Sequence, residues 1–455
     1  MTTPFRSLPS VDSALSDERL QRLMERYSRQ AVVKLVRSQI EDARESITNG
    51  IRPPSLEELV SAIEIKAAFI WREWPKSVIN ATGVILHTNL GRAALSDDAI
   101  KAITDVARSY SDLEFDLVSG RRGSRQASIS RLICQITGSE AAFVVNNNAS
   151  AVLLGLAAIA GGKEVIVSRG EAVEIGGGFR IPDVLRRSGA TLVEVGTTNR
   201  TYVQDFKDAI TERTGAFLSV HASNFKVVGF THSPGLADLI DLGHQTGIPV
   251  IHDLGSGCLL DTSQFGLSHE PMPQESISKG VDLAFFSGDK LLGGPQSGII
   301  VGKSELVEAI SKHPMARAMR IDKLSMAALH ATLLHYLREE ALDKIPTWRM
   351  IAIPANKVRV VAQRWKSSLV GPTSVEKSVS TIGGGSLPGE TLPTWTLCID
   401  GKGIDGGVEG LAKKLRQGNP PVIGRIEGDR ILLDPRTVLR SEEEALLKLL
   451  QDLVF

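Results

Sequence analysis

The first part of the chain carries a helical pattern of hydrophobic and polar residues. Between Ser16 and about Ile47, apolar residues recur at the three- and four-residue spacing of one face of a single helix, at Leu20, Leu23, Tyr27, Ala31 and Leu35. Ser16 or Asp17 can cap this helix. Asn49-Gly50 and Pro53-Pro54 end it, and the segment from Ser55 to Glu58 has the composition of another helix start. We therefore expect a helical N-terminal module over residues 1–70.

From about Ala141 the pattern changes to short apolar runs separated by helix-length segments. The runs are rich in Val, Ile and Phe and have the length of strands: Ala141–Val145, Glu164–Val167, Thr191–Val195, Ala216–Val220, Pro249–Ile251 and Val281–Phe286. The segments Ser150–Ala160 and Gly235–Gln245 are long enough for crossover helices. Strands that are apolar on both faces and separated by helices indicate an α/β domain with a mainly parallel sheet covered on both sides. We place this large domain at residues 71–320 and expect binding groups at the carboxyl ends of its strands.

The remainder of the chain indicates a second, smaller unit. From about Lys323 a helical region leads through Trp348 and Val358 into a glycine-rich turn at Gly383–Gly385, and a mixed tail of helices and strands follows. We therefore predict a smaller C-terminal α/β domain over residues 321–455.

Composition limits the class of protein. The 455 residues include 52 Lys plus Arg and 52 Asp plus Glu, so no global charge attracts nucleic acid or membrane, and any polyanion site must be local. Three widely spaced cysteines, Cys134, Cys258 and Cys398, argue against a disulfide framework and against a structural zinc site. No signal peptide and no run of roughly 20 apolar residues is present. We expect a soluble cytoplasmic protein that does not enter membranes.

A row of arginines accompanies the apolar stripe of the first predicted helix. It consists of Arg19, Arg22, Arg26, Arg29 and Arg37. One interpretation is a local basic ridge for a polyanion. The other, of equal weight on the sequence alone, is a solvated helix face whose charge Glu18 and Glu25 partly offset.

A single lysine follows a buried strand. The apolar run Val281–Phe286 leads through Ser287 and Gly288 to Asp289 and Lys290, and a glycine-rich loop comes next. A lysine amine must lose its proton before it attacks a carbonyl group, and partial burial near other cations favours that loss. The alternative is an ordinary surface lysine in a turn.

Two other strand ends supply complementary groups. The run from Ile248 to Ile251 leads to Asp253, where a carboxylate can keep the ring nitrogen of a pyridoxal phosphate cofactor protonated. A helix cap or a metal ligand is the alternative for this aspartate. The segment Val144–Ser150 leads from a strand into a helix and offers backbone N–H groups and small polar side chains to a phosphate.

The order of these three features favours one cofactor. A phosphate loop, an acid and a lysine follow one another at about 100 and then 37 residues, each at the end of a predicted parallel strand. Each signal is weak by itself, but together they indicate a pyridoxal phosphate enzyme.

Several long motifs resemble those of bacterial selenocysteine synthase, the L-seryl-tRNA(Sec) selenium transferase family. They are Asn80–Arg92, Ser119–Arg125, Val144–Asn148, Ser168–Glu171, Val195–Asn199, Ser287–Gln296 and Pro421–Ile426. The resemblance extends to the N-terminal helical module and so covers nearly the whole chain. It implies the aspartate aminotransferase-like fold of fold-type I pyridoxal phosphate enzymes.

The resemblance also implies roles for individual residues. Lys290 matches the lysine that binds pyridoxal phosphate covalently, Asp289 matches a residue implicated in acid-base work, and Asp253 takes the position of the pyridinium partner. The other residues that we assign to cofactor binding are Asn147, Asn148 and Ser287. Arg92, Arg317 and Arg320 match arginines that line the anion pocket for selenophosphate. Guanidinium groups suit such an oxyanion, and the spacing of Arg317 and Arg320 would place both on one face of a helix.

The implied reaction replaces the β-hydroxyl of serine, carried on tRNA(Sec), by selenium. Water is eliminated, selenium from selenophosphate adds to the dehydroalanyl product, and no metal is required. Serine alone cannot distinguish one seryl-tRNA from another, so the tRNA must be recognised over a wide surface. In the family the N-terminal domain does this, and Arg19, Arg22, Arg26 and Arg29 are our candidates. The family resemblance further implies a homo-oligomer, a decamer of five dimers.

Two rival functions stay open on the sequence. The first is a pyridoxal phosphate lyase, or another β-eliminating enzyme, that acts on a small amino acid or amino sugar. The second is a binding protein that retains the fold without turnover, which the set of Asp253, Asp289 and Lys290 disfavours. Cys258 is interpreted as a packed small side chain rather than a reactive thiol, and His252 as a core residue rather than a metal ligand.

Overall fold

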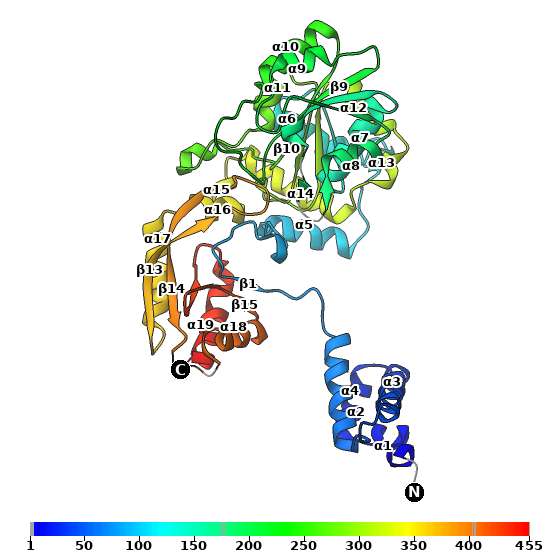
Figure 1. Cartoon of the computed structure of the whole chain (residues 1–455), viewed down its shortest axis with the longest axis vertical. Coiled ribbons are helices and arrows are strands. Elements are labelled where there is room, and N and C mark those ends of the chain that lie inside the picture. Colours follow the sequence, from blue (N-terminus) through cyan, green and yellow to red (C-terminus); the bar gives the residue numbers. More distant parts are fainter. Residues whose placement is uncertain (1–3, 173, 176–177, 403, 405, 455) are drawn as a thin grey trace. The chain divides into compact units, whose positions relative to one another are not determined.

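A computed structural model describes residues 4–172, 174–175, 178–402, 404 and 406–454. It divides the chain into two compact units, Met1–Ser77 and Val78–Phe455. Each unit has its own hydrophobic core, and we describe them separately (Figure 1). The finer division into three domains, at residues 70 and 320, stays a prediction.

The N-terminal unit is a bundle of short helices, as the sequence pattern predicts. Its helices are α1 (Val11–Leu15), α2 (Glu18–Arg26), α3 (Arg29–Thr48) and α4 (Leu56–Ile70). Their apolar faces, including Leu20, Val36 and Ile63, form one core. Asp17 caps α2, and Ser55 with Glu58 forms a capping box at the start of α4. Both helix starts were predicted.

The prediction of one continuous helix from Ser16 to Ile47 is wrong. The chain becomes extended at Tyr27, and Ser28 begins α3 by accepting a hydrogen bond from the Ala31 N–H. The Tyr27 hydroxyl donates to the Trp71 carbonyl at 3.1 Å, and the two rings pack with centroids 4.5 Å apart. These contacts favour a break that the apolar spacing does not reveal, and they place the predicted arginine row on two helices.

A seven-stranded sheet forms the centre of the second unit. Its order is β4 (Ala141–Val145), β12 (Gly298–Gly302), β11 (Leu283–Ser287), β10 (Val250–Gly255), β9 (Thr214–Val220), β5 (Glu164–Ser168) and β8 (Thr191–Val195). Strand β12 is antiparallel to both of its neighbours, and the other six strands run in one direction. The six predicted runs are therefore strands of a mainly parallel sheet, and their carboxyl ends meet at one edge.

Helices cover both faces of this sheet (Figure 1). Each face has its own hydrophobic core. One layer contains α6 (Ala127–Thr137), α9 (Val203–Asp208), α10 (Leu236–Thr246), α11 (Pro273–Ser278) and α14 (Lys323–Leu337), with α5 (Asp97–Arg108) packed on α14. The other contains α7 (Asn148–Ala160), α8 (Ile181–Arg187), α12 (Ser304–Lys312) and α13 (Met315–Ala318). The central strands β10, β11 and β12 are fully buried because helices cover both faces, whereas the edge strand β8 is partly exposed.

The C-terminal part has a four-stranded antiparallel sheet. Its order is β13 (Thr373–Thr381), β14 (Thr391–Asp400), β17 (Arg430–Leu433) and β16 (Arg425–Glu427). The helices around it are α15 (Ala341–Lys344), α16 (Pro346–Ala352), α17 (Ala355–Ser367), α18 (Gly407–Gln417) and α19 (Glu443–Val454). This agrees with the predicted smaller α/β part.

An early segment of the chain packs with this C-terminal part. Strand β1 (Ile79–Asn80) pairs in parallel with β15 (Val422–Ile423), and the Ile85 and Leu86 N–H groups donate to carbonyls at Thr381 and Ile382. The first residues of the second unit thus pack with the C-terminal part, and the chain forms the large sheet only after them. Among the described residues, every helix is too short or too polar to traverse a lipid bilayer.

We predict that Gly298→Ala destabilises the second unit by about 1–3 kcal/mol. A Cβ at this position would lie 2.1 Å from the Asn147 carbonyl oxygen and 2.8 Å from the Asn148 nitrogen, so the turn into α7 would have to move. Urea unfolding, compared with the unmodified protein, measures the change. Gly123→Ala is the control because its Cβ would meet nothing closer than 3.6 Å, and it should alter stability by less than about 0.5 kcal/mol. Equal effects of the two substitutions would contradict the prediction.

Candidate active site

Three predicted groups meet at the carboxyl edge of the large sheet. Asp253 is in β10, Lys290 follows the neighbouring strand β11, and Asn148 begins α7 directly after β4. Asp253 is 2% exposed and Lys290 is 6% exposed. The sheet therefore brings together an acid, an amine and a helix N-terminus that are far apart in the sequence.

Asp253 is a buried carboxylate with an amide partner. The Asn148 side-chain nitrogen donates to Asp253 Oδ1 at 2.9 Å, and the His221 N–H donates to the Asp253 carbonyl at the same distance. Burial raises the pKa of Asp253, while the Asn148 hydrogen bond and the positive charge of Lys290 oppose that rise. A cationic ring nitrogen placed against this carboxylate would stabilise its charged form.

The Lys290 amine occupies a narrow, largely dry space. Its Nζ donates to the Gly385 carbonyl at 3.3 Å, and a Cβ on Gly385 would lie 2.9 Å from this nitrogen. Burial lowers the pKa of Lys290, and the nearby Arg92 lowers it further, whereas Asp253, Asp289 and Glu270 act in the opposite direction. The amine is thus more readily neutral than that of a surface lysine, as attack on a carbonyl requires.

Asp289 is paired with Arg92 beside the lysine. The Arg92 guanidinium donates to Asp289 Oδ2 at 2.7 Å, and the Arg92 side chain is 35% exposed. Arg92 has a positive φ of 64°, a conformation that is uncommon for a residue with a side chain. The pair joins the loop before α5 to the lysine loop and leaves part of the guanidinium open.

Asn147 and Ser287 lie at the same edge but contribute differently. The Asn147 side chain accepts a hydrogen bond from the Ser150 N–H at 2.8 Å and caps α7. Its side-chain oxygen therefore shapes the helix start. Ser287 ends β11 and is 5% exposed.

The two remaining predicted anion ligands are placed differently from the expectation. Arg317 is in the short helix α13, but α13 ends at Ala318, and Arg320 is extended and bridges to Val145. The prediction that both lie on one helix face is wrong, because the chain has to leave the helix to pair with the end of β4. Both side chains are exposed, and Arg320 lies 3.6 Å from the Glu114 carboxylate.

A further pair of side chains, the half-buried His221 and the buried Glu270, was not predicted. His221 follows β9, and its Nε2 lies 3.3 Å from Glu270 Oε1. Glu270 is 2% exposed and is one of the acids that act on Lys290. His221 comes directly after the predicted run Ala216–Val220, so the strand-end rule could have identified it. Glu270 lies in a loop and gives no comparable signal.

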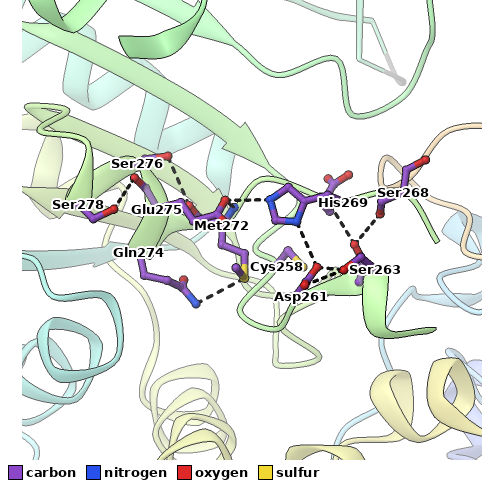
Figure 2. Close-up of polar contacts among 12 residues, drawn as sticks. Cys258, Asp261, Ser263, Ser268, His269, Met272, Gln274, Glu275, Ser276 and Ser278 are labelled. Atoms are coloured by element: carbon purple, nitrogen blue, oxygen red, sulfur yellow. Dashed lines mark hydrogen bonds and ion pairs between the residues drawn. The ribbon is translucent and has the colours of Figure 1, made fainter. Parts of the chain in front are cut away.

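A polar network holds the segment that carries Glu270. His269 lies between Asp261 and Glu275, with Nδ1 3.1 Å from Asp261 Oδ1 and Nε2 3.0 Å from Glu275 Oε2 (Figure 2). These carboxylates raise the pKa of His269. Protonated His269 therefore stabilises the segment, and this contribution is lost as the pH rises through the raised pKa.

The structure agrees with the sequence-based interpretations of Cys258 and His252. Cys258 is fully buried, its thiol donates to the Leu260 carbonyl at 3.0 Å, and burial raises its pKa, so it is a packed and unreactive side chain. His252 Nδ1 lies 2.9 Å from Ser276 Oγ, and burial lowers the pKa of His252 to about 3. His252 is therefore a neutral core residue at neutral pH.

The four N-terminal arginines are not equivalent. The Arg19 guanidinium lies 3.0 Å from Asp17 and 2.7 Å from Glu57, so its charge is already neutralised within the unit. Arg22, Arg26 and Arg29 are exposed, and Arg26 lies 4.0 Å from Glu73. The exposed basic surface is smaller than the sequence suggests.

The residues at the sheet edge fit a pyridoxal phosphate cofactor. A buried amine suits its aldehyde, a buried carboxylate suits its ring nitrogen, and the N-terminus of the 13-residue helix α7 suits its phosphate. In addition, Asn148 Oδ1 is buried without a hydrogen-bond partner among the described residues. A ligand donor at this edge would satisfy it.

Comparisons with known proteins identify the relatives of this chain. Residues 78–439 match the family model described as L-seryl-tRNA selenium transferase, and residues 5–44 match the model of the selenocysteine synthase N terminal. The L-seryl-tRNA(Sec) selenium transferase of Carboxydothermus hydrogenoformans is 47% identical over 98% of this chain and 97% of its own length. That of Geobacter sulfurreducens is 46% identical over 99% of both chains.

A solved structure confirms the predicted fold. The structure of D-glucosaminate-6-phosphate ammonia-lyase aligns with a TM-score of 0.58, at 20% identity, over 83% of this chain and 95% of its own. The α/β architecture of fold-type I, with a mainly parallel sheet and a smaller C-terminal part, is thus shared with known enzymes.

We predict that Arg92→Gln raises the pKa of Lys290. The substitution removes a nearby positive charge and releases Asp289 from its ion pair, and both changes favour the charged amine. The pH profile for reductive methylation of Lys290, measured by peptide mapping on cofactor-free protein, should therefore move to higher pH. Arg121→Gln, which alters an exposed arginine with no ion pair among the described residues, should leave the profile in place. A profile that stays or moves to lower pH in the Arg92 variant contradicts the prediction.

Proposed function

The chain belongs to the L-seryl-tRNA selenium transferase family, and on this basis we propose that it converts L-seryl-tRNA(Sec) to L-selenocysteinyl-tRNA(Sec). The selenium donor is selenophosphate, and the cofactor is pyridoxal 5'-phosphate. One observation carries the proposal: a chain alike over its full length to these transferases buries Lys290 beside Asp253 at the carboxyl edge of the sheet.

The cofactor, when bound, supplies an electron sink for the bond changes at the α- and β-carbons of serine. Lys290 would hold its aldehyde carbon, and Asp253 would face its ring nitrogen. Asn148 fixes Asp253 by the 2.9 Å hydrogen bond, and the backbone at the start of α7 would hold the phosphate. Ser287 ends β11 at this edge, and Asn147 caps the start of α7.

Proton transfer at the α-carbon is assigned to Lys290. Its lowered pKa increases the fraction of neutral amine near neutral pH, which a general base requires, and the same amine can return the proton later. Asp289 is assigned acid-base work on the departing hydroxyl group. Arg92 holds the Asp289 carboxylate in place at 2.7 Å, so the two act as one positioned pair.

The anion pocket is assigned to Arg92, Arg317 and Arg320. The three come from different segments of the fold, and guanidinium groups hold phosphate-like oxyanions without losing charge at neutral pH. The Glu114 carboxylate near Arg320 offsets part of this charge, so Arg317 is the more available of the two exposed arginines. Elimination of the β-hydroxyl releases water, and the selenium of selenophosphate then forms the new C–Se bond. A water molecule cleaves the Se–P bond, so phosphate is the net by-product.

We assign tRNA binding to the N-terminal unit and to its exposed residues Arg22, Arg26 and Arg29. Residues 5–44 match a family model of their own, and the unit has its own core. Arg19 has a structural role because it forms ion pairs with Asp17 and Glu57. We also assign the protein to the cytoplasm as a homo-oligomer, with the decamer expected from the family.

We predict that the purified protein, loaded with pyridoxal phosphate, converts seryl-tRNA(Sec) to selenocysteinyl-tRNA(Sec) when selenophosphate is present. Lys290→Ala should lower the rate by at least about 10³-fold, because both the cofactor anchor and the base are removed. Chromatography of the aminoacyl group released from the tRNA measures the product.

Borohydride reduction followed by peptide mapping provides the control for the same protein. A pyridoxyl label should appear on Lys290 and on no other lysine. A labelled protein that acts on free amino acids or amino sugars but not on seryl-tRNA(Sec) would favour the lyase instead. An unlabelled Lys290 would favour a binding protein.

We predict that removal of residues 1–77 abolishes tRNA(Sec) binding and leaves the cofactor site intact. The boundary is that of the two compact units, so the second unit keeps its core. Fluorescence anisotropy of labelled tRNA(Sec) measures affinity, and the absorbance of bound cofactor reports the site. A truncated protein that binds tRNA(Sec) as tightly as the full chain would refute the assignment to the N-terminal unit.

A further inference from the structure

A basic pocket of about 380 Å³ lies in the C-terminal part of the chain. Helices α16 and α17 line it, together with the segment Pro435–Glu443 that leads from β17 into α19. Lys290, Asp253 and Arg92 are not among its lining residues. The pocket is therefore separate from the candidate active site.

The charge in this pocket is strongly unbalanced. Five cations line it, Arg349, Lys357, Arg364, Arg436 and Arg440, and Glu443 is the one acid among its described lining residues. The chain as a whole has a formal net charge of +0. The excess of positive charge is thus a local feature of this surface.

Two of the five cations already have binding partners within the protein. Arg364 forms an ion pair with Glu443, which also accepts from the Trp365 indole nitrogen at 2.6 Å. Arg436 is 4% exposed, and its guanidinium donates to three backbone carbonyls at 2.7–2.9 Å. These two arginines stabilise the walls.

The other three cations, Arg349, Lys357 and Arg440, are uncompensated. Among the described residues, none of them has a side-chain hydrogen bond or a carboxylate within ion-pair distance. Arg349 is half-buried, and burial, together with the charge of Arg440, lowers its pKa despite an opposing effect of Asp97. Arg440 and Lys357 are exposed, so an anion from solution can reach them and would relieve the repulsion between Arg440 and Arg349.

One hydrophobic cluster contains both a wall of the pocket and a residue of the lysine loop. Trp348 and Met350, on either side of Arg349 in α16, belong to the hydrophobic cluster that contains Leu291. Leu291 directly follows Lys290. The pocket cations are therefore fixed to the same rigid core that positions the lysine loop.

We propose that this pocket binds a backbone phosphate of the substrate tRNA. The inference rests on the proposed function, because an enzyme whose substrate is a tRNA must hold a polyanion close to the site where the aminoacyl end reacts. Two guanidinium groups and an ammonium group around one cavity match the oxygens of a phosphodiester. This contact lies outside the N-terminal unit and adds affinity without reading sequence.

The test compares tRNA(Sec) binding by the full-length holoenzyme and by Arg349→Gln/Arg440→Gln. The control is Lys366→Gln/Arg416→Gln, which removes the same charge from exposed positions outside the pocket. We expect the pocket variant to bind about tenfold more weakly near 0.1 M salt, with the slope of log affinity against log salt reduced by about 1. The control should bind as the unmodified protein does, and Arg349→Lys/Arg440→Lys should recover most of the affinity.

Three outcomes overturn the proposal. The first is equal affinity and equal salt slope for the pocket variant and its control, with cofactor absorbance showing that both are folded. The second is tight binding of inorganic phosphate by calorimetry, lost in the pocket variant while tRNA binding is unchanged, which would assign the pocket to a small phosphate compound. The third is weakened tRNA binding with an unchanged salt slope, which would indicate an indirect structural effect.

Failure of the proposed function is measured separately. Conversion of seryl-tRNA(Sec) by the unmodified holoenzyme tests it, and this assay does not involve the pocket variant. Where conversion is observed, the pocket variant should reach the unmodified rate at saturating tRNA and lose activity only at low tRNA concentration. A loss at saturating tRNA would contradict a role in tRNA binding alone.

Discussion

The candidate site is built around two groups of opposite charge, Lys290 and Asp253, which are buried at one edge of the large sheet. Lys290 and Asp253 are both nearly inaccessible, and desolvation disfavours the charged form of each. The fold offsets this with the Asn148 amide on the carboxylate and a carbonyl on the amine. Pyridoxal phosphate requires two groups of this kind. A partly neutral lysine amine can attack its aldehyde, and a carboxylate without a strong cationic partner can pair with its ring nitrogen.

Six of the seven strands of the sheet were predictable from short runs rich in Val, Ile and Phe. Such runs, separated by helix-length segments, fit the strands of a sheet that helices cover on both faces. Strand β12 was missed because Gly298–Gly302 has only three apolar residues between two glycines and follows a loop rich in glycine and proline. The break at Tyr27 was missed for another reason: it depends on a contact with Trp71, which no local spacing encodes.

Some residues of the candidate site were also predictable from the sequence, and others were not. Lys290, Asp253 and Asn148 follow predicted strands, so the rule that binding groups lie at the carboxyl ends of parallel strands brings them together. Glu270 lies in a loop and reaches Lys290 only through the folding of a segment held by His269. Arg317 and Arg320 were placed on one helix because a spacing of three residues is ambiguous until the end of the helix is known.

The arginines of this chain have different roles because their surroundings in the fold differ. Arg19 is neutralised by Glu57, which is 38 residues away in the sequence, and Arg436 is bound by backbone carbonyls. Arg92 holds the acid beside the reactive lysine, whereas Arg349 faces another cation without an acid in ion-pair distance. A guanidinium that has found its partner within the fold contributes to structure. One that is held near like charge, with no internal partner, is free to bind an anion from outside, and in a chain with no net charge such positions are where a polyanion can be held.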